Sequence, residues 1–156
     1  MTRTLSMWTA MVALLVSAAG VFAQGVGNDS PDPVMVAQRC VASMETATDR
    51  TTGAIGDTTA AAVALIARLD AAGAPDREII RAGQAGTERV QVIGRFGASR
   101  VTNIAEHCTR ALRRLGADRA LIGRVQNAAE GFREDIRNAV ARGSMAIRQA
   151  VADAIG

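Results

Sequence analysis

Apolar and small residues recur in steps of three and four through most of this chain, and that spacing restricts its fold more than any other feature. On an α-helix, such steps place the apolar residues on one face. The pattern starts directly after Asp32-Pro33, a pair typical of a helix N-cap followed by the first helical residue. Within residues 33–72 the face consists of Val34, Ala37, Val41, Met44, Thr48, Thr51, Ile55, Thr58, Ala62, Leu65, Leu69 and Ala72. This is a heptad pattern, which favours a long helix packed in the manner of a coiled coil.

Two short segments divide the pattern into three stretches of similar length. Gly73 and Pro75 mark the end of one helix and the start of the next, and Gly116 and Asp118 repeat this arrangement. The third helix is expected to start at Ala117 or Asp118. No run of alternating β-branched residues suggests a strand. The chain is therefore predicted to be all-α, with residues 33–156 forming an up-down-up antiparallel bundle of three long helices.

Two alternatives stay open for the first helix. Gly53 and Gly56 fall where the apolar pattern is weakest, so the helix either continues through them or breaks there.

Folding at the first turn places these two glycines opposite Gly94, with Gly143 at the same level. Such a band of small residues would let the helices approach closely. Alternatively, it forms a flexible waist, because Gly costs about 1 kcal/mol relative to Ala in a helix, or it reflects compositional bias alone.

Residues 1–23 have the three parts of a secretory signal peptide. Arg3 supplies a positive charge, residues 7–16 are uncharged and mostly apolar, and small residues lead to a cleavage pattern that ends at Ala23. A membrane anchor is the alternative, but the uncharged run over residues 4–23 is barely long enough to span a bilayer. The protein is therefore predicted to be secreted or periplasmic, and residues 24–32 to form a mobile tail before the bundle domain.

The composition argues against a nucleic-acid partner. All 18 basic residues are arginine, and 15 acidic residues offset most of their charge. Phe96 and Phe132 are the only aromatic residues after the predicted cleavage site, so the chain lacks a platform on which bases could stack. A net charge this close to zero gives no general attraction to phosphate.

The chain has two cysteines, Cys40 and Cys108. They lie almost equally far along the chain from the turn at Gly73-Ala74, one before it and one after it, so antiparallel helices bring the two to nearly the same height. In an exported protein this coincidence predicts a disulfide, and metal ligation by the thiols is the alternative. The bond would stabilise the fold by about 4 kcal/mol on the chain-entropy model.

His107, the only histidine, is adjacent to Cys108, and Met44 lies one helical turn from Cys40. These four side chains could surround a soft metal such as copper, or Met44 and His107 could ligate haem. Neighbouring helical residues point about 100° apart, however, and no Cys-x-x-Cys-His motif is present. The expectation is therefore no cofactor, with Met44 as a core residue and His107 beside a disulfide.

Three functional hypotheses follow. A narrow bundle core and the lack of a Ser-His-Asp, phosphate-loop or zinc pattern predict a non-enzymatic protein that acts by protein–protein contact or self-association. A metal- or haem-binding bundle that uses Met44 and His107 is the second hypothesis. Reversible binding to a membrane surface is the third, because residues 75–115 carry eight arginines against four acids. Such a face is otherwise a solvated one, with pairs such as Glu106 and Arg110. Glu130 and Glu134 share a face of the third helix and are likewise expected to face solvent.

Overall fold

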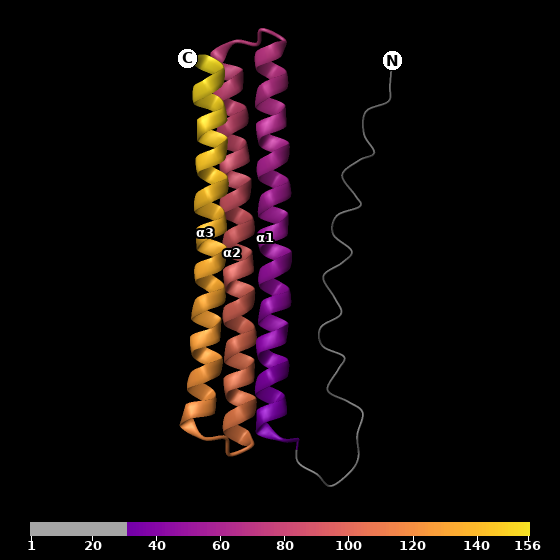
Figure 1. Cartoon of the computed structure of the whole chain (residues 1–156), viewed down its shortest axis with the longest axis vertical. Helices are drawn as coiled ribbons and strands as arrows, with labels where there is room; N and C mark the ends of the chain where they lie inside the picture. The colour runs from indigo at the N-terminus through magenta and orange to yellow at the C-terminus, as the bar shows by residue number, and fades with distance from the viewer. Residues whose placement is uncertain (1–30) are drawn as a thin grey trace, which may run out of the picture. The chain divides into compact units, whose positions relative to one another are not determined.

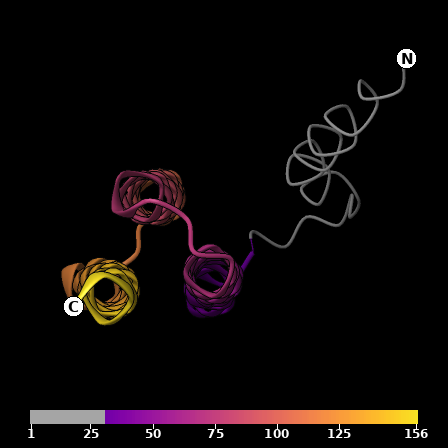
Figure 2. The same cartoon turned by 90° about the horizontal axis from the view of Figure 1, so that it is seen from above.

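The computed structural model describes residues 31–156, which form one compact unit of three α-helices. The helices are α1 (Pro33–Ala71), α2 (Asp76–Arg114) and α3 (Arg119–Ile155), and no strand occurs within this unit. They run up, down and up beside one another (Figure 1). Seen along their axes they form a triangle in which every helix packs against the other two (Figure 2). The predicted all-α bundle of three long helices is confirmed. The predicted signal peptide and the tail up to residue 30 lie outside the described residues.

Local signals in the sequence explain where the helices begin. The Asp32 side chain accepts a hydrogen bond from the Val34 amide at 2.9 Å, and Pro33 occupies the first turn of α1. Asp118 plays the same part for α3, where its carboxylate accepts a bond from the Leu121 amide at 2.6 Å. The third helix therefore starts at Arg119, one residue after its cap. These side chains satisfy amides that have no partner within the helix.

The two turns have the same structure. Gly73 and Gly116 adopt φ values of 68° and 70°, the left-handed conformation that glycine reaches without steric cost. After α1, the Gly73 amide donates to the Asp70 carbonyl and the Ala74 amide to the Leu69 carbonyl. The equivalent amides after α2 make the same pair of bonds, so both helices end in a Schellman motif. The similarity between the two turn sequences thus reflects one helix-ending structure used twice.

The first helix is continuous, which decides between the two alternatives for Gly53 and Gly56. The weak part of its apolar face is rich in threonine, and these hydroxyls bond within the helix. Thr48, Thr51 and Thr59 donate to the carbonyls four residues earlier, at 2.7–2.9 Å. Because their hydrogen bonds are satisfied in this way, the threonines can face the other helices at little cost.

The heptad prediction was wrong in its period, because the most deeply buried residues recur every eleven positions. Leu65, expected in the apolar face, is 40% exposed, whereas its neighbour Ile66 is 1% exposed. An 11-residue repeat has about 3.67 residues per turn, close to the natural value of the α-helix, so the helices need little supercoiling. Figure 1 shows them running nearly straight. The large residues that follow this repeat are Met44, Ile55 and Ile66 in α1, Ile79, Val90, Val101 and Leu112 in α2, and Val125, Ile136 and Ile147 in α3.

Glycines of α2 and α3 permit close contact between the helices. A Cβ atom at Gly86 would lie 2.6 Å from the Ala62 Cβ, and one at Gly97 would lie 2.8 Å from the Thr51 Cβ. Gly83 and Gly94 accommodate valines of α3 in the same manner, and Gly143 accommodates Thr59. The predicted band was therefore wrong in one part: Gly53 and Gly56 are exposed and face open space.

Candidate functional site

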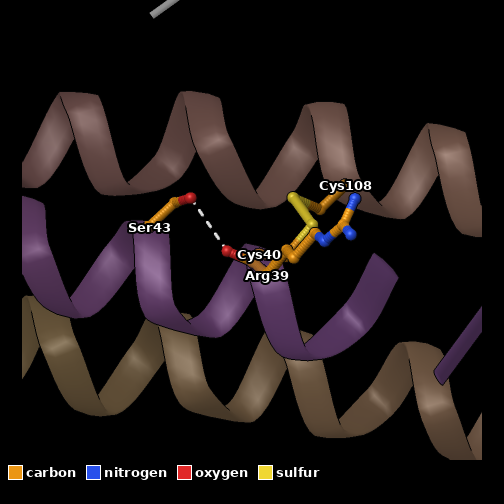
Figure 3. The surroundings of a disulfide bond; sticks show 4 residues. All are labelled: Arg39, Cys40, Ser43 and Cys108. Carbon is orange, nitrogen blue, oxygen red and sulfur yellow. Dashed lines mark hydrogen bonds between the residues drawn. A yellow bond between two sulfur atoms is a disulfide. The ribbon is translucent and has the colours of Figure 1, made fainter. Parts of the chain in front are cut away.

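The Cys40 and Cys108 sulfurs are bonded at 2.07 Å, which links α1 to α2 (Figure 3). The two Cα atoms lie 6.0 Å apart, within the ordinary range for a disulfide. Both side chains belong to the core and are 8% exposed. The predicted cross-link is confirmed, and it joins residues 68 positions apart in the chain. A disulfide is compatible with the oxidising compartments outside the cytosol.

Two polar residues of α1, Arg39 and Ser43, lie beside the disulfide (Figure 3). Arg39 is exposed, and its backbone carbonyl accepts a hydrogen bond from the Ser43 hydroxyl at 2.8 Å (Figure 3). Both sulfurs are occupied by their mutual bond, so in this state neither cysteine offers a thiolate to a metal or a substrate.

The structure places the two proposed metal ligands in different environments. Met44 is fully buried among core residues, whereas His107 is exposed on the surface of α2. Within residues 31–156, no group of three or more His, Cys, Asp or Glu side chains is arranged to hold a metal ion. Of the four residues in the metal hypothesis, only the two cysteines are brought into bonding contact.

The charges lie mostly on the outer faces of the helices. α2 carries eight arginines and four acids, whereas α1 carries three arginines and four acids. Arg133 and Arg137 pair with Glu130 and Glu134 one turn earlier in α3. The suggested Glu106–Arg110 pair does not form. None of the three helices is long and apolar enough to cross a membrane.

The structure contains a hollow between α2 and α3 that the sequence did not predict. It has a volume of about 530 Å³ and lies at the end of the bundle where α2 finishes and α3 begins. We call it the arginine groove, because Arg110, Arg113 and Arg133 contribute to its walls. The remaining lining residues are Thr102, Ala105, Glu106, Thr109, Gln126, Asn127, Ala129 and Glu130.

Arg133 is the most constrained charged residue of this groove. Its guanidinium donates to Glu130 at 3.0 Å and, at the long distance of 3.5 Å, to the Thr102 hydroxyl. Its Nε atom is buried and has no hydrogen-bond partner. The sequence pattern predicted only that Glu130 faces solvent and not that it pairs with Arg133, and the burial of Nε depends on contact with α2.

A second hollow lies between the same helices toward the opposite end of the bundle. It is smaller, about 350 Å³, and we call it the apolar groove because Ile80, Gly83, Ile147 and Val151 are among the residues that line it. Gln84, Thr87, Glu88, Gln91 and Arg148 form its polar edge. The α2–α3 face thus has an apolar section and an arginine-rich section along its length.

The fold and its cross-link define a disulfide-linked bundle of three helices with two open hollows on one face. No protein-family model, no curated protein and no solved structure matches this chain.

Proposed function

We propose that this chain is an exported, non-enzymatic protein that acts by protein–protein contact through its α2–α3 face. The observation that carries the proposal is the pair of open hollows between these two helices, one apolar and one lined by arginines. A surface that combines an apolar section with hydrogen-bonding and charged side chains resembles the contact surfaces of proteins in composition. Export is part of the proposal, supported by the disulfide and by the signal-peptide pattern of residues 1–23.

The dispersal of the exposed apolar residues favours a partner in the grooves over self-association along a continuous apolar stripe. The large ones lie on all three helices, at Val34, Met35, Leu65, Ile80, Phe96, Met145 and Ile155. Single exposed apolar side chains of this kind are common on monomers and do not by themselves define an interface.

Site-specific photocrosslinking tests the contact. A photoreactive residue in place of Gln91, at the edge of the apolar groove, or of Asn127, in the arginine groove, should yield a discrete adduct in the compartment to which the protein is exported. The control is the same residue in place of Asp57, which is exposed on α1. Equal or absent adducts at all three positions would reject contact through the α2–α3 face. Sedimentation velocity over a concentration series then distinguishes a second copy from a different protein.

Export has a direct test of its own. Expression of the full chain in a secreting bacterial host should yield a mature protein that starts at Gln24. Edman sequencing or intact mass determination measures this start. An uncut chain retained in the cytosol would contradict the proposal.

A further inference from the structure

The arginine groove carries positive charge that its own residues do not neutralise. Three arginines face two glutamates among its lining residues, which leaves one positive charge. Glu130 is paired with Arg133, whereas Arg110 and Arg113 form no ion pair with any residue of the range 31–156. Both side chains are exposed, so their guanidinium groups can reach an incoming ligand.

The incomplete hydrogen bonding of Arg133 points to the same groove. The Nε group is a buried donor without an acceptor, and a buried unsatisfied donor costs free energy. The Arg133 side chain is 32% exposed and lines the groove, so a ligand can contact it, and a change of its side-chain rotamer would turn Nε toward that ligand. An oxygen acceptor brought by a ligand could then satisfy the donor that the free protein leaves without a partner.

The chemistry of the walls selects the ligand class. A guanidinium group binds a carboxylate through two parallel hydrogen bonds. Glu106 and Glu130 repel a densely charged polyanion, which argues against nucleic acid, and the amides of Gln126 and Asn127 suit the polar groups of a peptide. We propose that the arginine groove binds an acidic segment of a partner protein, with one or two separated carboxylates held by Arg110, Arg113 and Arg133. This inference rests on the contact function proposed above.

Fluorescence anisotropy at low ionic strength tests this inference. The probe is a dye-labelled, end-blocked, alanine-based helical peptide with two glutamates one turn apart, and its twin carries glutamines instead. The glutamate peptide should bind the full chain and the glutamine twin should bind about tenfold more weakly, or not at all, as expected for loss of a charge-assisted hydrogen bond. Added salt should weaken binding.

Two double variants of α2 make the test specific. R110Q/R113Q should weaken binding of the glutamate peptide about tenfold or more. R95Q/R100Q removes the same charge from exposed positions outside the groove and should leave binding within about twofold. E106Q should strengthen binding, because it removes a repulsive carboxylate from the wall. Circular dichroism verifies that each variant is folded.

The possible outcomes separate this inference from the contact function. No binding by the wild-type chain, or equal weakening by the two double variants, would overturn the acidic-segment proposal. Adducts at Gln91 or Asn127 that persist in R110Q/R113Q would then retain the contact function. Absence of adducts at both positions in the otherwise wild-type chain, together with peptide binding that depends on Arg110 and Arg113, would instead retain the binding site and reject the proposed contact function.

Discussion

Three pairs of facing residues between α1 and α2 are equally spaced along the helices but differ in their chemistry. Cys40 meets Cys108 near one end, and Thr51 meets Gly97 in the middle of the bundle. Ala62 meets Gly86 toward the other end. Successive pairs are eleven residues apart on each helix, which is the period of the buried residues. The disulfide therefore occupies a position that elsewhere holds a glycine packed against a small residue.

The glycine levels leave no space for a second side chain, whereas the disulfide level accommodates two. The Cβ atoms joined by a disulfide lie about 3.8 Å apart. A Cβ added at Gly97 would lie 2.8 Å from that of Thr51, and one at Gly86 would lie 2.6 Å from that of Ala62. Glycine is thus required at these two levels for packing, whereas the cross-linked level has room for two side chains and a bond between them.

Removal of the cross-link should have the largest effect. The C40A/C108A variant should lose about 4 kcal/mol of unfolding free energy, because the unfolded chain regains the entropy that a long closed loop had removed. Urea unfolding followed by circular dichroism measures the loss. Reduction of the wild-type chain should lower its stability by a similar amount. A loss of unfolding free energy below about 1 kcal/mol in both cases would show that packing alone stabilises the end of the bundle that contains Cys40 and Cys108.

Substitution of an interface glycine should come next. G86A should cost about 1–3 kcal/mol, because the new methyl group overlaps the Ala62 Cβ, which cannot move without its backbone. G97A should cost a similar amount through its overlap with Thr51. The same urea titration measures both. If either variant equals the wild type in stability, the close approach of α1 and α2 is not a requirement of the fold.

Glycines on the outer faces should respond with the opposite sign. A Cβ at Gly53, Gly56 or Gly131 would meet no atom within 4 Å, and none of these residues has positive φ. G53A, G56A and G131A should therefore each raise stability by up to about 1 kcal/mol, through the higher helix propensity of alanine. They are matched controls for G86A and G97A. Destabilisation by G53A or G56A would contradict the open surroundings of these two glycines.

The smallest effect is expected for a surface ion pair. Glu134 pairs with Arg137 one turn along α3, and both side chains are more than half exposed. E134Q should change the unfolding free energy by about 0.5 kcal/mol or less, since solvent and salt screen such pairs. Thermal unfolding at low and high salt would detect it. A loss as large as that of G86A would contradict the view that stability resides in the interfaces.

Helix boundaries could be predicted from the amino-acid sequence because they depend on neighbouring residues. Asp32 and Asp118 mark helix starts, Gly73 and Gly116 mark helix ends, and equal helix lengths follow from their spacing. Equal lengths and short turns impose an antiparallel path, which is why the pairing of the two cysteines could be predicted.

The buried face of each helix is set by how the three helices pack against one another. Leu65 and Ile66 are almost equally apolar, so either could face the core. The buried faces expected from a seven-residue and an eleven-residue repeat separate by only about one position over thirty residues. The choice between them therefore depends on the partner helices. The same holds for the glycines, which look alike in the sequence although Gly86 is crowded and Gly53 is open. The arginine groove also exists only once α2 and α3 are side by side, because its charges come from residues some twenty positions apart. Contacts of this kind are set by packing across helices, which local spacing does not encode.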